Sequence, residues 1–258
     1  MANLDAPSLN DRGDIAFLAT VRRGRETVEA IYVRTGGKIQ KVVGQGDAAP
    51  TGGTFAGFGP PSLNNRGVIA FGAVVEGRAV PGGIFLAESG QIRMILGAGD
   101  DTPLGGIFAK FSEHIAVNDA GTVAFHARLK NTPVQAAIMA LDGGRLRSVA
   151  AIGDRAPDGG TFSNFGLWPA LAADGTIGFT ASVDGGTSAV GVFVNGADGS
   201  TRLAGVGDTA PGGGTIVTLT LYPVVSIAAG GVVTFAAAPS ATGEGVEGLY
   251  LAERPRAR

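Results

Sequence analysis

Apolar and polar residues alternate over short segments along the whole chain, and turn-forming residues separate one segment from the next. Residues 68–75 and 83–87, for example, are rich in β-branched and aromatic residues and are flanked by glycine, asparagine and serine. No segment has the spacing of apolar residues that marks one face of a helix. The pattern predicts an all-β protein made of short strands joined by tight turns.

The same pattern of strands returns about every 54 residues. A signature of the form Asn-x-x-Gly-x-x-Ala-Phe is complete in residues 10–17, 64–71 and 118–125 and degraded in residues 172–179 and 229–235. A second motif, Gly-Asp-x-x-Pro, keeps this period, with its aspartates at Asp47, Asp100, Asp154 and Asp208. Two motifs that share one period identify five copies of one structural unit.

Each copy holds up to four predicted strands in succession, joined as hairpins by Gly-Gly, Ser-Gly and Asp-Gly pairs. Repeated four-stranded antiparallel units are typical of propeller blades, so we predict a five-bladed β-propeller in a single domain over residues 1–258. The repeats are approximately residues 6–53, 54–106, 107–160, 161–214 and 215–258. An open β-solenoid is the alternative, but its coils would be shorter and its strands would not follow one another as hairpins. The last repeat lacks a fourth strand, so we expect an incomplete last blade with an unpaired edge.

The Asn-x-x-Gly-x-x-Ala-Phe signature resembles the tandem NxxGxxAF repeat family of bacteria over nearly the whole chain. That resemblance implies an exported, surface-anchored protein without an assigned activity, and hence an extracellular or cell-surface location. The order of the Gly-x-Ile-Ala-Phe and Ile-Tyr-Val segments is also loosely similar to the propeller repeats of the bacterial Tol system, which supports the fold and implies nothing about function. We recognise no anchor and no signal peptide, because residues 1–5 carry neither a basic nor an apolar stretch.

Composition narrows the classes of function. A net charge of −2 with scattered basic residues gives little electrostatic support for binding nucleic acid. The chain has no cysteine, which excludes disulfides, zinc–thiolate sites and a cysteine nucleophile. No apolar stretch approaches the roughly 18 residues that a membrane span needs. We therefore predict no nucleic-acid partner, no membrane span and no cofactor apart from Ca²⁺.

One position of the predicted innermost strand varies from copy to copy. In successive repeats it holds Ala6, Pro60, His114, Trp168 and Tyr222. Strand alternation places these side chains at the mouth of the central channel. Aromatic groups there form stacking platforms for a glycan or another flat ligand, which makes His114, Trp168 and Tyr222 the predicted ligand-binding residues. The alternative is that these side chains plug the channel.

The Gly-Asp loops are predicted to lie on the same rim as these aromatic groups. Their carboxylates, on Asp47, Asp100, Asp154 and Asp208, are the candidate ligands for Ca²⁺. A residue retained in every copy commonly serves the repeat itself, however, and aspartate caps turns by accepting backbone N–H groups. The Asn-x-x-Gly turns fall on the opposite rim, where we interpret asparagine and glycine as structural.

Catalytic motifs are scarce. The two histidines, His114 and His126, lie on adjacent predicted strands without carboxylates spaced to complete a metal site. There is no Gly-x-Ser-x-Gly elbow and no phosphate-binding loop. A glycosidase needs a pair of carboxylates, whereas Glu113 is the only acid that the inner strands place near the mouth, and its parity directs it away from the channel. The sequence therefore favours a protein that is not an enzyme.

The sequence supports three hypotheses about function. The first is a non-enzymatic binding or scaffold propeller that holds a glycan, a small ligand or a protein at its channel-mouth rim. The loops between second and third strands vary most, share that rim and suit recognition. The second hypothesis is a carbohydrate-active hydrolase or lyase with acids at the channel mouth. The third is a structural repeat that assembles through the edge of its last blade.

Overall fold

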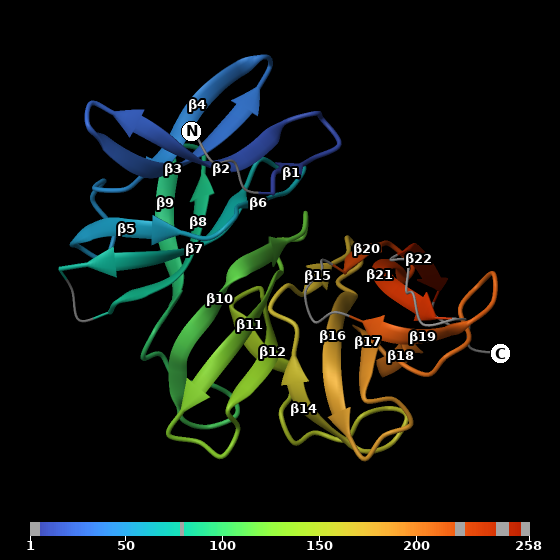
Figure 1. Cartoon of the computed structure of the whole chain (residues 1–258). Coiled ribbons are helices and arrows are strands. Elements are labelled where there is room, and N and C mark those ends of the chain that lie inside the picture. Colours follow the sequence, from blue (N-terminus) through green and yellow to red (C-terminus); the bar gives the residue numbers. More distant parts are fainter. Residues whose placement is uncertain (1–5, 78–79, 220–224, 241–247, 254–258) are drawn as a thin grey trace.

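The computed structural model describes residues 6–77, 80–219, 225–240 and 248–253, and within these ranges every regular element is a β-strand. Five antiparallel sheets follow one another along the chain, one in each copy of the repeat. They are arranged around a common centre as the blades of a propeller (Figure 1). The structure confirms the predicted fold class, an all-β, five-bladed β-propeller.

Strands pair within each blade, and where the innermost strand is divided in two, both parts pair with the strand that follows. Blade 1 comprises β1 (Ser8–Leu9), β2 (Ile15–Arg23), β3 (Glu26–Thr35) and β4 (Lys38–Gly44). Blade 2 comprises β5 (Thr54–Phe58), β6 (Ser62–Leu63), β7 (Ile69–Glu76), β8 (Gly82–Glu88) and β9 (Gln91–Gly97). Blade 3 comprises β10 (Ile107–Val117), β11 (Val123–Lys130), β12 (Ala136–Asp142) and β13 (Arg145–Ala151). Blade 4 comprises β14 (Thr161–Phe165), β15 (Ala170–Leu171), β16 (Ile177–Asp184), β17 (Val190–Gly196) and β18 (Gly199–Gly205). Blade 5 comprises β19 (Thr215–Leu219), β20 (Ser226–Ala228), β21 (Val232–Ser240) and β22 (Gly248–Glu253).

The innermost strand of a blade is interrupted near its middle. In blade 3 it is one strand, β10, whose register shifts between Phe111 and Ile115. In blade 2 it divides into β5 and β6 around Pro60 and Pro61, which have no N–H group for the ladder. It also begins at Thr54, earlier than the sequence predicted. Because of this interruption, the alternation of side chains along one half of the strand does not predict which way the side chains point on the other half.

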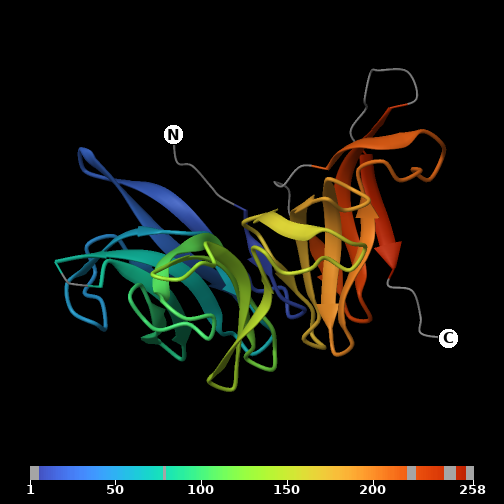
Figure 2. The same cartoon turned by 90° about the horizontal axis from the view of Figure 1, so that it is seen from below.

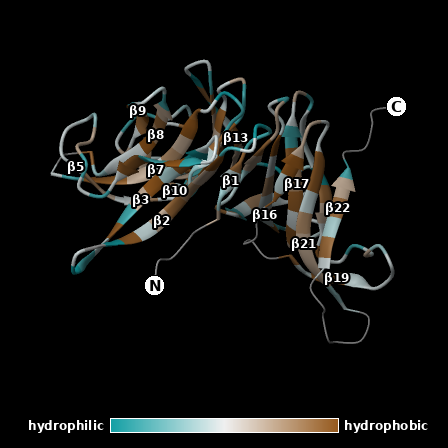
Figure 3. Ribbon diagram, turned by 90° about the horizontal axis from the view of Figure 1, so that it is seen from above, coloured by the Kyte–Doolittle hydropathy of each residue, from teal (hydrophilic) through white to brown (hydrophobic). Residues whose placement is uncertain are grey.

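The hydrophobic core lies between consecutive blades and within each of them. Ile84 of blade 2 packs in one cluster with Phe125 of blade 3, and both are fully buried. Inside blade 2 the ring of Phe85 stacks on that of Phe71, with centroids 5.7 Å apart, and meets that of Phe55 edge to face at 5.1 Å. Figure 3 shows hydrophobic residues along the strands and hydrophilic residues in the loops. The phenylalanine of the repeat signature is therefore a core residue.

The Asn-x-x-Gly turns join each of the first three blades to the next. The Oδ1 atom of Asn64 accepts hydrogen bonds from the backbone N–H groups of Arg66 and Val68. Its Nδ2 atom donates to the carbonyl oxygen of Asn118, one repeat further on, at 2.9 Å. Asn10 donates in the same way to Asn64, and Asn118 donates to Ala172. The asparagine thus closes its own turn and also holds the next blade.

The junction between blades 4 and 5 uses a different residue. Ala172 stands where the earlier copies have asparagine, and the carboxylate of Asp174 accepts hydrogen bonds from the N–H groups of Thr176 and Gly230. The hydrogen bond from Gly230 in particular holds the pKa of Asp174 below its ordinary value. A carboxylate two residues later therefore performs both tasks of the missing asparagine.

Blades 1 and 5 stand apart at the two ends of the series of blades around this centre (Figures 1 and 2). Leu249 and Leu251 of β22 are 79% and 60% exposed, whereas the residues in the same positions of β8, Ile84 and Leu86, are covered by the following blade. Among the described residues β22 pairs only with β21, so the sheet of blade 5 is three strands wide there. This agrees with the incomplete last repeat of the sequence. The described part of the chain contains no helix that is long and apolar enough to cross a membrane.

Candidate functional site

His114 of β10 and Trp168, which lies between β14 and β15, meet face to face near the innermost strands. Their ring centroids are 4.6 Å apart and their planes differ by 1°. Burial lowers the pKa of His114 to about 4, so the ring is neutral at pH 7, and its Nδ1 atom has no hydrogen-bond partner within the described ranges. The structure therefore brings two of the three predicted ligand-binding residues together. The third, Tyr222, lies outside the described residues.

The four Gly-Asp aspartates turn toward the backbone of their own blades. In each case Oδ2 accepts a hydrogen bond of 2.7–2.9 Å from the N–H group three residues earlier. Two of the carboxylates also bind a cationic side chain of the same blade, Asp47 with Lys41 and Asp208 with Arg202. In the part of the chain that the structure describes, no three metal-ligating side chains gather in one place. These aspartates serve the turns of the repeat, and Ca²⁺ at this rim stays a prediction.

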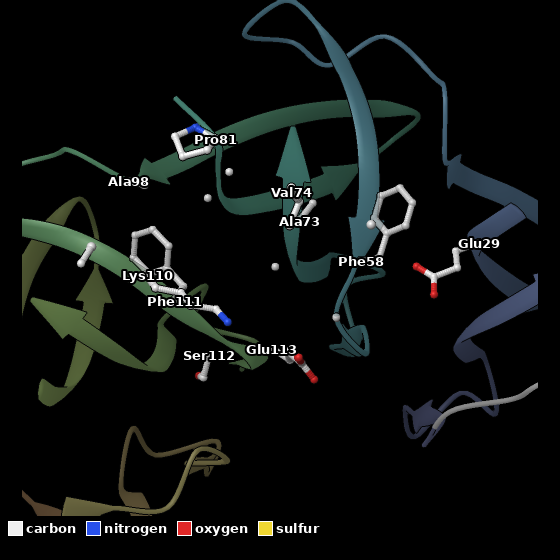
Figure 4. Close-up of a pocket in the computed structure, with 16 residues that line it drawn as sticks. Glu29, Phe58, Ala73, Val74, Pro81, Ala98, Lys110, Phe111, Ser112 and Glu113 are labelled. Carbon is white, nitrogen blue, oxygen red and sulfur yellow. The ribbon is translucent and has the colours of Figure 1, made fainter. Parts of the chain in front are cut away.

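A hollow of about 470 Å³ opens between blades 2 and 3, and we call it the blade 2–3 hollow (Figure 4). Phe58, Phe111 and Pro81 supply apolar walls. Glu113 and Lys110 approach from β10 of blade 3, and Glu29 approaches from β3 of blade 1. A space of this size with apolar walls and a few charged groups has the character of a small-molecule site.

Glycines of blade 2 create this space. Gly72 occupies the position where the other copies carry Leu18, His126, Thr180 and Ala236. A Cβ atom on Gly72 would lie 3.5 Å from the carbonyl oxygen of Ser112, within ordinary contact. Gly57 likewise replaces the longer side chains of Lys110, Asn164 and Thr218, and its missing Cβ would lie 3.8 Å from Oε2 of Glu29. The hollow exists because blade 2 departs from its repeat at these positions.

Sequence reasoning found part of this site and missed the rest. It directed Glu113 away from the channel, and the structure places that residue at the hollow between the blades. It placed Glu29 in a variable loop between the second and third strands of blade 1, whereas the residue lies within β3 and lines the hollow from that blade. The signal that could have located the hollow was available, namely glycine in one copy where the others carry side chains.

A second space of about 370 Å³ lies at the equivalent junction of blades 3 and 4, and we call it the blade 3–4 cleft. His126, Arg128 and Leu167 help to line it. Leu167 precedes Trp168, and Glu113 of the blade 2–3 hollow precedes His114. Each of the stacked rings therefore directly follows a residue that lines one of the two spaces.

The fold and these spaces define the class of the protein, a tandem-repeat β-propeller with ligand-sized spaces between its middle blades. The chain belongs to a family of unknown function (DUF7453), which it matches twice, over residues 1–140 and 131–256.

Among solved structures the chain is similar to one described as an oligogalacturonate lyase in complex with manganese, with a TM-score of 0.54 and 13% sequence identity. The similarity covers 97% of this chain and 65% of that chain, so this chain spans just under two thirds of the length of its structural relative. At this identity the likeness shows the fold alone. No curated protein matches the sequence.

Proposed function

We propose that this protein is a binding propeller that holds a small polyhydroxylated ligand, such as a short glycan, in the blade 2–3 hollow. The observation that carries the proposal is the replacement of side chains by glycine in blade 2, at Gly57 and Gly72, where the other copies carry larger residues. A volume of about 470 Å³ falls in the range of about 300–1,000 Å³ that is usual for ligand sites.

The walls of the hollow match the two kinds of surface that a sugar presents. The rings of Phe58 and Phe111 suit the apolar face of a pyranose. The carboxylates of Glu29 and Glu113 accept hydrogen bonds from hydroxyl groups, and Lys110 donates them. In this proposal the His114–Trp168 stack supports one side of the rim, and the protein acts at the cell surface or outside the cell.

Replacing Gly72 with leucine is expected to weaken ligand binding by at least about tenfold, or about 1.4 kcal/mol. Leucine occurs at this position in blade 1, a Cβ atom on Gly72 meets only ordinary contacts, and Gly72 lines the hollow, so we expect the added side chain to occupy that space. A glycan array identifies the ligand of the wild-type protein, and titration calorimetry then measures its affinity for each variant.

The matched control is Ala236→Leu, which makes the same kind of change at the same position of blade 5, away from the hollow. Binding should survive it unchanged. Equal affinity of the Gly72→Leu and wild-type proteins would reject the hollow as the site. Loss of binding in Trp168→Ala alone would move the site to the stacked rings.

The hydrolase or lyase hypothesis has one observation in its favour, since two carboxylates, Glu29 and Glu113, line the same hollow. Paired carboxylates are what glycoside hydrolysis requires. Incubation of the protein with the glycan that it binds distinguishes the two hypotheses. Cleavage products that disappear in Glu113→Gln favour an enzyme, and an intact glycan favours the binding propeller.

Assembly through blade 5 is a second candidate function, supported by the exposed leucines and the half-paired edge of β22. Two copies that join through β22 would form one continuous sheet and bring Leu249 and Leu251 of one copy beside those of the other. We expect sedimentation velocity to detect dimers that increase with concentration and disappear in Leu249→Asp. Val74→Asp is the control, because Val74 is also exposed but lies in blade 2. A protein that stays monomeric at every concentration would reject this candidate.

A further inference from the structure

The blade 3–4 cleft repeats the geometry of the blade 2–3 hollow with different chemistry. His126 and Arg128 take the places that Gly72 and Val74 have in blade 2, and Asn164 takes the place of Lys110. Gln135 also lines the cleft, and no acidic residue does. In the blade 2–3 hollow, by contrast, two glutamates face one lysine. The same junction of blades therefore carries opposite charge in the two places.

Arg128 supplies an uncompensated positive charge to the cleft. Its side chain is exposed, and the described residues offer it no ion pair. Arginine presents paired N–H donors that match the two oxygens of a carboxylate. The amide groups of Asn164 and Gln135 add further donors beside it.

His126 closes the inner end of this polar group. It is 4% exposed, and within the described ranges its ring nitrogens have no hydrogen-bond partner. Burial, and after it the charge of Arg128, lowers the pKa of His126 to about 4. A neutral buried imidazole with unused nitrogens beside an arginine is suited to an anion that brings its own acceptors.

The other residues that line the cleft are apolar, and they indicate what the uncharged part of the ligand is like. Leu129, Ile152, Leu167 and Ala136 give the cleft apolar walls around the polar group. An inorganic anion would leave these walls in contact with water, whereas a molecule with an apolar body would cover them.

From these contacts we propose that the blade 3–4 cleft binds a small organic carboxylate, with the carboxylate on Arg128 and the apolar body against the leucines. This site adjoins the blade 2–3 hollow, since Ala109 lines both spaces, but its polar and charged groups are its own. It does not depend on the function proposed for the hollow. The four side chains that carry it are His126, Arg128, Gln135 and Asn164.

Benzoate is a suitable probe, since it joins a carboxylate to an apolar ring, and benzamide is its neutral isostere. NMR of the imidazole groups follows His126 during titration with each compound. We expect benzoate to shift the His126 signals in a saturable way and to raise the pKa of His126 by roughly one unit, because an anion favours the protonated ring. Benzamide should do neither. Of the residues that line the cleft, only His126 carries an imidazole, so the signal has a single source there.

Arg128→Val, which introduces the residue found at this position in blade 2, should abolish the response to benzoate. Gly72→Leu, in the other space, should leave it unchanged and so separates this site from the blade 2–3 hollow. Equal responses to benzoate and benzamide, or an undiminished response in folded Arg128→Val, would overturn the proposal. A stronger response to phosphate than to benzoate would also overturn it, because the apolar walls would then contribute nothing.

Discussion

Replacing Asn64 with alanine is expected to lower the free energy of unfolding by about 3 kcal/mol. Asn64 is 4% exposed, and its side chain bonds the N–H groups of Arg66 and Val68 and the carbonyl oxygen of Asn118. Alanine leaves the N–H groups of Arg66 and Val68 without a partner, and the carbonyl oxygen of Asn118 keeps only its bond from the N–H group of Gly121. A buried unpaired group costs about 1–3 kcal/mol. Because one of these bonds joins two blades, the loss should affect the unfolding of the whole domain, as measured by equilibrium denaturation in urea.

Asn10→Ala is the matched control for this effect. Asn10 makes the same contacts in blade 1, with the N–H groups of Arg12 and Asp14 and the carbonyl oxygen of Asn64, but it is only partly buried. Water can replace the lost partners there, so we expect a loss of about 1 kcal/mol. Equal losses in the two variants would contradict the explanation by burial.

Blade 4 provides a design that should recover part of the loss. The double variant Asn64→Ala with Arg66→Asp reproduces in blade 2 the arrangement of Ala172 and Asp174. In blade 4 the carboxylate of Asp174 bonds the turn at Thr176 and the next blade at Gly230. We expect the double variant to be more stable than Asn64→Ala alone, since the introduced carboxylate would accept the unpaired N–H group of Val68 and, as Asp174 does at Gly230, an N–H group of the next blade.

The fold could be predicted from the sequence because the repeat records it several times. Phe71, Phe125, Phe179 and Phe235 are buried core residues, and Asn10, Asn64 and Asn118 hold the next blade. Each requirement of one blade therefore appears again about 54 residues later. The break in the innermost strand could not be predicted in the same way. It depends on Pro60 and Pro61 in one blade and on a register shift in another, and these are different solutions to the same local geometry.

The candidate site is formed by residues that depart from the repeat, and only some of these departures could be interpreted from the sequence. The varied position correctly brought His114 and Trp168 together, but their parallel stacking at 4.6 Å follows from packing between blades 3 and 4. The blade 2–3 hollow depends on side chains that are absent, at Gly57 and Gly72. A missing side chain gives no apolar or charged signal along the chain, and it becomes a cavity only when two blades meet.

Lowering the pH from 7 to 4 is expected to reduce the free energy of unfolding by about 6 kcal/mol through His114 and His126 together. Burial lowers the pKa of each to about 4 in the folded protein, against about 6.5 in an unfolded chain. The unfolded state therefore takes up the protons first as the pH falls. Stability is fully present above pH 6.5 and is lost between about 6.5 and 4, by about 3 kcal/mol for each histidine. A loss of this size approaches the whole stability of a typical domain.

The carboxylates act in a different pH range and can be separated from the histidines. Hydrogen bonds from Asn10 and Gly230 lower the pKa of Asp14 and of Asp174, so their contributions are lost only below the ordinary carboxyl range, near pH 4. Urea denaturation at intervals from pH 7 to 4.5 therefore reports the histidines. His126→Gln should reduce the slope of stability against pH by about half in this range, whatever its stability at pH 7, because only His114 then takes up a proton on unfolding. Parallel plots of stability against pH for the wild type and His126→Gln would mean that His126 is protonated to the same extent in the folded and unfolded proteins. That result would contradict a pKa of His126 lowered by burial and by Arg128.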